Sequence, residues 1–372
     1  MKRFGIIITL LLLVLTLSAC DLPEVTPPVE VLPATATLDS QFMPLPSPTD
    51  APEVVQPEVI TPANAGNLVL TKKAAVSNIQ HITFSDDGQI LALTTQNFDA
   101  NDAQVYSLTM LNTADLSTKS IYTSTDQRIA AVSPDGHTAV LVNASLDAFS
   151  LVDTLGSAED SQTIILPDMI NTLSVSADSR YLAVSKMEKW EVELFDLAIL
   201  EPVKTLTGFE TAAPVYNAGF ERTSQWLVWH ARGTIQLQEI ETGVLSPVFS
   251  HEDFVSAYAL SPDGTLLASA SGKTVNGEMI PAVILWDTMT GAELRILPHP
   301  SSVSALAFSP DGKLLAAATG NTIVVWNTLD GSLVATLSGH ADMVTQVAFA
   351  PDQSALATSG ADNQLCLWQV IP

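Results

Sequence analysis

The first residues that could do chemistry are carboxylates in a short polar run. Asp99 and Asp102 lie in the segment Gln96–Asp102, where most side chains carry an oxygen atom. Clustered carboxylates are the ligands that Ca²⁺ takes in proteins. The calcium-loop pattern Asp-x-Asp-x-Asp-Gly, however, is missing from this segment. We therefore expect a solvated polar loop and no metal.

Three histidines recur at a fixed distance from an apolar residue. His251, His299 and His340 each precede such a residue by nine positions. This phasing assigns the three imidazoles to equivalent positions of separate repeats, so they are not expected to converge on one ion. We therefore expect no zinc site, although histidine is a common zinc ligand.

The segment Ser271–Pro281 contains the tripeptide Gly272-Lys273-Thr274, which resembles the end of a phosphate-binding loop. Such a loop also needs a glycine five residues before Gly272 and a strand-to-helix setting. Leu267 occupies that position, and the surrounding pattern is that of a hairpin. The sequence also lacks a Gly-x-Ser-x-Gly elbow, a His-Glu-x-x-His helix and a Cys-His signature. We expect neither enzyme activity nor a cofactor.

The chain begins with two cations and a short apolar run. Lys2 and Arg3 precede the apolar segment Phe4–Leu17, which is shorter than the roughly 20 residues that a spanning helix needs. The following Leu17–Cys20 resembles a bacterial lipobox, in which cleavage frees Cys20 for lipidation. Residues 1–19 are therefore predicted to be a lipoprotein signal peptide, with an uncleaved anchor as the alternative. Both readings place the domain outside the cytoplasm, tied to the cell membrane.

Residues 20–66 have the composition of a spacer. Ten of the 22 prolines lie between Asp21 and Asn67, together with seven acidic residues and no Lys or Arg. Such a segment has too little apolar surface to offset its ordering entropy, so we predict an extended, solvated tether. A proline-rich ligand for a partner domain is the alternative. The second cysteine, Cys366, lies near the other end of the chain and is expected to be a small buried hydrophobe.

The elements that would position these residues are repeated. An apolar residue followed by Ser, Pro, Asp and Gly recurs with variations, and Asp and Gly at such a tip allow a strand to reverse tightly. The apolar anchors are 40 to 48 residues apart, and they are Phe84, Val132, Val175, Phe220, Leu260, Phe308 and Phe349. Repeats of this length predict a stacked architecture, because one unit cannot bury both of its faces.

The last repeat carries the fullest signature, with Gly339-His340 at its start and Trp368 at its end. With the seven turns, it resembles the WD-repeat β-propeller family, whose blades are four-stranded. The resemblance implies an all-β, seven-bladed propeller over residues 67–372. The last repeat lacks its fourth strand, and in the family an N-terminal strand, here Asn67–Thr71, closes the ring. Closure removes an edge that would otherwise promote aggregation.

The resemblance also implies a buried hydrogen-bond network within a blade. In the family a His, a Ser or Thr, an Asp and the Trp form it, and only the last repeat matches throughout. The matching residues are His340, Thr358, Asp362 and Trp368. In the sixth repeat, Gly320-Asn321 stands where the Asp would be. We interpret this network as structural, because each buried polar group in it has a partner.

A formal net charge of −25 excludes nucleic acid as a partner and disfavours an anionic bilayer surface. We expect a membrane-anchored, extracytoplasmic binding scaffold that engages a protein or peptide of the cell envelope. Two alternatives remain open: a propeller hydrolase or lactonase with a metal in its channel, and a purely structural subunit of an envelope complex.

Two long insertions locate the expected partner surface. In the family, loops between second and third strands gather on one face with the links between blades, and Asn97–Asp102 and Thr274–Pro281 are such loops. Apolar tips on polar loops favour contact with a partner. The partner-binding candidates are Phe98, Asp99, Asp102, Met279 and Ile280.

Overall fold

The computed structural model describes residues 57–371, except residues 134–136, 155–161, 188, 190, 208–214 and 221–224. For residues 215–218 it describes the backbone alone. The predicted signal peptide, Cys20 and residues 20–56 of the predicted tether lie outside the described residues.

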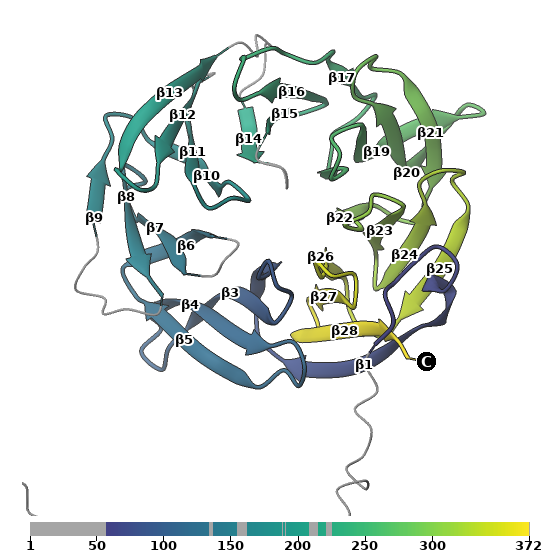
Figure 1. Ribbon diagram of the computed structural model, residues 1–372, viewed down its shortest axis with the longest axis horizontal. Coiled ribbons are helices and arrows are strands. Elements are labelled where there is room, and N and C mark those ends of the chain that lie inside the picture. Colours follow the sequence, from purple (N-terminus) through teal and green to yellow (C-terminus); the bar gives the residue numbers. More distant parts are fainter. Residues whose placement is uncertain are drawn as a thin grey trace, which may run out of the picture. The chain divides into compact units, whose positions relative to one another are not determined.

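The described residues form seven four-stranded antiparallel sheets arranged as the blades of a ring, which confirms the predicted seven-bladed β-propeller (Figure 1). Blade one contains β2 (Ile79–Phe84), β3 (Ile90–Phe98), β4 (Gln104–Asn112) and β5 (Thr118–Ser124). Blade two contains β6 (Gln127–Val132), β7 (Thr138–Asn143), β8 (Ala148–Asp153) and β9 (Gln162–Ile165). Blade three contains β10 (Ile170–Val175), β11 (Tyr181–Lys186), β12 (Glu191–Asp196) and β13 (Glu201–Thr207).

The remaining blades follow in chain order around the ring. Blade four contains β14 (Val215–Phe220), β15 (Trp226–Ala231), β16 (Thr234–Glu239) and β17 (Phe249–Ser250). Blade five contains β18 (Ala257–Leu260), β19 (Leu266–Val275), β20 (Glu278–Asp287) and β21 (Glu293–Pro298). Blade six contains β22 (Val303–Phe308), β23 (Leu314–Thr319), β24 (Thr322–Asn327) and β25 (Leu333–Ser338). Blade seven contains β26 (Val344–Phe349), β27 (Leu356–Gly360) and β28 (Gln364–Val370), joined by β1 (Leu68–Ala75).

Each of the seven apolar anchors found in the sequence is the last residue of the first strand of its blade. In blades one, three, five, six and seven, the turn that follows is closed by its own side chains. In blade five, the Ser261 hydroxyl donates to Asp263 Oδ1 at 2.6 Å and accepts from the Leu266 N–H at 2.9 Å. Gly264 follows with φ of 71°, a conformation that costs glycine little. Local turn chemistry therefore fixes where this first strand ends.

The ring is closed by an N-terminal strand, as the sequence predicted. β1 lies outermost in blade seven, in the order β1-β28-β27-β26. It pairs antiparallel with β28 from Leu68 opposite Val370 to Ala75 opposite Gln364. The strand is longer than the predicted Asn67–Thr71 and covers the edge of β28 along its length.

The antiparallel order of the strands gives the ring two different ends. The turns between second and third strands and the linkers between blades share one end, which we call the hairpin face. The turns between first and second strands lie at the opposite end, which we call the turn face. Every first strand therefore runs from the hairpin face to the turn face.

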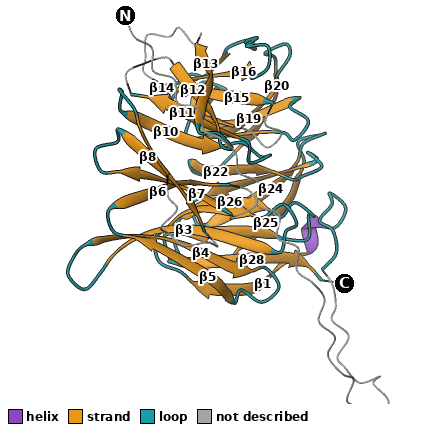
Figure 2. Cartoon of the chain, turned by 60° about the vertical axis from the view of Figure 1, so that its left-hand side comes forward, coloured by secondary structure: helices purple, strands orange, loops and turns teal. Residues whose placement is uncertain are grey.

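The predicted tether is wrong for its last ten residues. Ile60 is fully buried, in one apolar cluster with residues of blades six and seven. The Ile60 N–H donates to the Gln353 carbonyl at 2.9 Å, and the Glu58 N–H donates to the Val370 carbonyl at 3.0 Å. The single 3₁₀ turn η1 (Ala65–Asn67) then lies beside β25 (Figure 2). Gln353 belongs to the turn after β26, so this segment docks at the turn face.

Apolar residues of neighbouring blades pack face to face and form the core. Alternate residues of one strand serve opposite faces of its sheet. In β23, Ala316 packs in the cluster shared with blade seven, whereas Ala317 packs in the cluster shared with blade five. Cys366 is fully buried, as predicted. In the part of the chain that the structure describes, no helix is long and apolar enough to cross a membrane.

Candidate functional site

The two predicted insertions are regular β-hairpins rather than loops. Pairing of β19 with β20 continues without interruption to Val275 opposite Glu278, and pairing of β3 with β4 continues to Phe98 opposite Gln104. Asn276 and Gly277 form the tip with φ of 53° and 85°, which is the conformation of a two-residue type I′ turn. The hairpin agrees with the sequence pattern, but residues 274–275 and 278–281 of the predicted loop belong to its two strands.

The blade-one candidates lie at the tip of the β3–β4 hairpin. The Phe98 side chain is 63% exposed. Asp99 accepts hydrogen bonds from the N–H groups of Ala103 and Asn101 at 2.9 and 2.8 Å, and these bonds lower the pKa of its carboxyl group. Asp102 adopts a positive φ of 63° in the same turn. The Asp99 carboxylate therefore shapes the hairpin tip. Among the described residues, no three His, Cys, Asp or Glu side chains are grouped to hold a metal ion.

The blade-five candidates line a cavity of about 310 Å³ on the hairpin face. Met279, which is 55% exposed, and Ile280 form one wall. Asp253 and Phe254, from the linker between blades four and five, also line it. The structure therefore brings Met279 and Ile280 together, while Phe98 belongs to a hairpin across the ring (Figure 1). Sequence reasoning missed Asp253 and Phe254, because nothing local in the chain indicates that this linker faces the hairpin.

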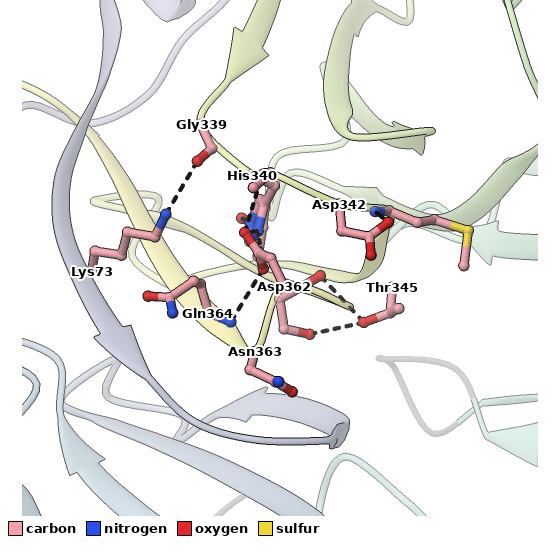
Figure 3. A network of polar contacts seen from close by, with 12 residues as sticks. Lys73, Gly339, His340, Asp342, Thr345, Asp362, Asn363 and Gln364 are labelled. Atoms are coloured by element: carbon pink, nitrogen blue, oxygen red, sulfur yellow. Dashed lines mark hydrogen bonds and ion pairs between the residues drawn. The ribbon is translucent and has the colours of Figure 1, made fainter.

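The predicted network of blade seven is present, and Figure 3 shows the part of it around His340 and Asp362. His340 Nδ1 lies 3.0 Å from Asp362 Oδ1, and His340 Nε2 lies 2.8 Å from Thr358 Oγ1. Trp368 Nε1 donates to the same hydroxyl at 3.0 Å. Burial raises the pKa of Asp362, but hydrogen bonds from the Ala341 N–H and from His340 outweigh burial and leave that pKa lowered.

Blade five contains the same chain without its carboxylate. His251 Nε2 and Trp286 Nε1 each lie 2.7 Å from Ser269 Oγ. The Gly233 carbonyl, 3.2 Å from His251 Nδ1, takes the place of the carboxylate. Burial lowers the pKa of His251 to about 4.

Blade six has lost two members of the chain. Ala317 stands where Ser269 and Thr358 stand in the neighbouring blades, because it likewise lies two residues after the partner of the tryptophan. Trp326 Nε1 therefore donates directly to His299 Nε2 at 3.3 Å. His299 Nδ1 is buried and has no partner among the described residues, and burial lowers the pKa of His299 to about 4.

Comparison with known proteins identifies repeats in the second half of the chain. The family model of the WD domain, G-beta repeat, matches residues 243–276, 291–327 and 331–369. The chain carries WD repeats. Matches two and three run from the fourth strand of one blade to the third strand of the next, so β21–β24 and β25–β28 are each one WD repeat.

One curated relative is an uncharacterized WD repeat-containing protein of Synechocystis sp. (strain ATCC 27184 / PCC 6803 / Kazusa). It is 24% identical to this chain over 200 residues. The match covers 53% of this chain and 42% of that protein, so the chain spans less than half of the relative.

The exposed apolar side chains of the propeller differ in type between its hairpin face and its outer strands. Apart from Met289, every exposed Phe or Met among the described residues lies on the hairpin face. The set on that face is Phe98, Met169, Met187, Phe254, Met279 and Met343. Exposed Val, Leu and Ile side chains instead lie mostly on the outer, fourth strands and the segments that lead to them, such as Ile121, Ile165, Val203, Leu294 and Leu333.

Proposed function

We propose that this protein is a binding scaffold that holds a protein or peptide partner on its hairpin face. We further propose that a lipid on Cys20 anchors it to the cell membrane, outside the cytoplasm. WD-repeat propellers generally mediate protein interactions, and the ring provides a rigid support for the residues on its face.

One observation carries the proposal: the gathering of exposed Phe and Met side chains on the hairpin face. Aromatic anchors contribute much of the binding energy of interfaces, and methionine adapts its shape to different partners. Scattered exposed aliphatic side chains, such as those of the outer strands, are ordinary on a soluble surface. The two types are therefore not equivalent, and the hairpin face is the better candidate for partner contact.

Site-specific photo-crosslinking tests this surface. A photoreactive phenylalanine analogue is placed at Phe98 or Met279 on the hairpin face, and at Met289 or Leu329 as matched exposed controls elsewhere. We expect the two hairpin-face positions to capture one and the same protein from native membranes, and the two controls not to capture it. Capture from Met289 and Leu329 alone would place the partner surface elsewhere and contradict the proposal.

The membrane anchor is tested separately. Cys20→Ser removes the thiol that would carry the lipid, so metabolic labelling with a fatty acid should disappear and an unprocessed precursor should accumulate. Labelling that persists in this variant would reject lipidation at Cys20. Pro57 enters the propeller at the turn face, at the opposite end of the ring from Phe98 and Met279. That arrangement supports an anchor that leaves the hairpin face accessible.

A further inference from the structure

The cavity in blade five combines apolar walls with one carboxylate. Phe254, Met279 and Ile280 supply the walls of this space of about 310 Å³. Asp253 adds a carboxylate to the lining, and no cation contacts it among the described residues. The nearby Lys273 is already engaged, since its Nζ lies 3.3 Å from Glu252 and 2.7 Å from Glu293.

Gly272 leaves room for both the Asp253 carboxylate and the Met279 thioether. A Cβ atom at Gly272 would lie 2.9 Å from Met279 Sδ and 3.0 Å from Asp253 Oδ2. Such contacts are closer than side chains tolerate, so a larger residue at position 272 would push both groups away. The cavity therefore depends on Gly272 to keep an apolar surface beside a charge.

Contacts within the protein hold Asp253 and Phe254 in place before any ligand arrives. The Ser271 hydroxyl donates to the Asp253 carbonyl at 3.1 Å, and the Phe254 N–H donates to Asp253 Oδ1 at 2.7 Å. The Phe254 ring packs edge to face against His230, with ring centroids 6.0 Å apart. Binding would therefore not have to order Asp253, which lowers its entropic cost.

This chemistry fits an alkyl chain that ends in a cation. Asp253 Oδ1 is occupied by a backbone N–H, so Oδ2 is the oxygen left for a ligand. A single oxygen suits the point charge of an ammonium better than the two-pronged fork of a guanidinium. A net charge of −25 attracts a cationic partner segment from a distance.

We propose that this cavity binds a lysine side chain of the partner, with the methylenes against Phe254 and Met279 and the ammonium on Asp253 Oδ2. The inference rests on the proposed function, because it describes how the hairpin face recognises its partner. It adds that the partner offers a lysine within a cationic segment.

The propeller contains its own control for this site. Asp342 and Met343 occupy the same places before blade seven as Asp253 and Phe254 occupy before blade five, counted from His340 and His251. The Met343 N–H donates to Asp342 Oδ1 at 2.7 Å, as in blade five. The β27–β28 turn of blade seven is short, so no equivalent of Met279 stands opposite.

Methyl NMR of the full chain, labelled with ¹³C at its methionine methyl groups, tests the site. The probes are the N-acetyl methylamides of lysine, norleucine and arginine, which share an alkyl stem and differ in the head group. We expect lysine to shift the Met279 methyl signal at least fivefold more than norleucine or arginine at equal concentration, with the signal of Met343 unmoved. Asp253→Asn should abolish the advantage of lysine, and Asp342→Asn should preserve it.

Equal shifts of Met279 with lysine and norleucine, or an unchanged lysine advantage in Asp253→Asn, would overturn the inference. A larger shift with arginine would overturn the choice of lysine. Photo-crosslinking from Phe98 tests the proposed binding function separately. If Phe98 captures a partner but lysine shows no advantage at the Met279 signal, the lysine site is rejected and the binding scaffold stands. If Phe98 captures no partner and lysine shows no advantage, the binding scaffold is rejected as well.

Discussion

Blade seven contains an unbroken chain of polar contacts from Trp368 to Asp362, whereas blade six, beside it, contains a tryptophan and a histidine in direct contact. Both are nevertheless four-stranded sheets with the same pairing order. The turn after the first strand and the alternation of apolar residues are common to both. The comparison indicates that these local features build the blade, and that the buried network tunes its stability.

The two blades differ in a second way. Blade six is formed by one continuous segment, whereas blade seven combines β26–β28 with β1, from the other end of the described chain. The Thr71 hydroxyl donates to the Leu367 carbonyl at 3.1 Å across a separation of 296 residues. Blade seven therefore depends on a contact that no local sequence can provide, and it is the blade where damage should be largest.

Removing residues 1–75 should have the largest effect. The deletion takes β1 from blade seven and exposes the backbone donors and acceptors of β28, so we expect oligomers and loss of a cooperative thermal transition. Removing residues 1–62 should lower stability by about 2 kcal/mol, because it takes away the fully buried Ile60. Removing residues 1–56 should change neither property. Light scattering measures oligomer formation, and thermal unfolding measures the stability of the three proteins. Equal behaviour of the three would refute closure of the ring by β1.

Thr358→Val comes next in size. Valine keeps the shape of threonine but leaves His340 Nε2 and Trp368 Nε1 without their shared partner. We expect a loss of about 3 kcal/mol in the free energy of unfolding, since each buried polar group left unpaired costs about 1–3 kcal/mol. Thr336→Val, on the exposed outer strand of blade six, should change stability by less than about 0.5 kcal/mol. Equal urea midpoints for the two variants would contradict a stabilising network.

His299 should make blade six sensitive to acid. Its pKa is about 4 when folded and about 6.5 when unfolded, so between these values the unfolded chain binds a proton that the folded chain does not. The stability that depends on neutral His299 is therefore complete above about pH 6.5, falls as pH falls, and is fully lost below about pH 4. His299→Gln should weaken the pH dependence of the free energy of unfolding between about pH 4 and 6.5, measured by urea unfolding. The part of this dependence that comes from His251 should remain. An unchanged profile would show that His299 titrates alike in both states.

Ala317→Ser should have the smallest effect, and a favourable one. The new hydroxyl would stand between His299 Nε2 and Trp326 Nε1, as Ser269 stands between His251 and Trp286 in blade five. We expect a gain of about 0.5–1 kcal/mol in the free energy of unfolding. Ala316→Ser is the matched control, because it buries a hydroxyl on the opposite face of β23 and should destabilise. A loss of stability in Ala317→Ser would contradict the assigned position.

Much of this fold was predictable because its determinants are local. The side chains of Ser261 and Asp263 close their turn, and Gly264 adopts the positive φ that it needs. The repeated motif therefore revealed the number of blades even where the tryptophans are missing. Blade seven was predictable for a different reason, because all four network residues could be matched to a known family.

The remainder depends on contacts between distant parts of the chain. Proline-rich composition predicted a tether up to Gly66, but Ile60 finds a pocket that exists only once blades six and seven have formed. The cavity in blade five was not predictable either, because Asp253 and Gly272 meet through the register of a linker against a hairpin. Met279 and Ile280 were proposed from their apolar character alone, and the structure adds the carboxylate beside them.

The backbone hydrogen bond between Glu58 and Val370 has a topological consequence. The two ends of the propeller lie in contact, so a short peptide linker could join them. The chain could then be opened at another exposed turn while every blade keeps its four strands. Opened at the Asn276-Gly277 tip, for example, blade five would become the composite blade, and blade seven would become continuous. The position of the chain ends therefore decides which blade is assembled from both of them. The ring itself has no intrinsic first or last blade.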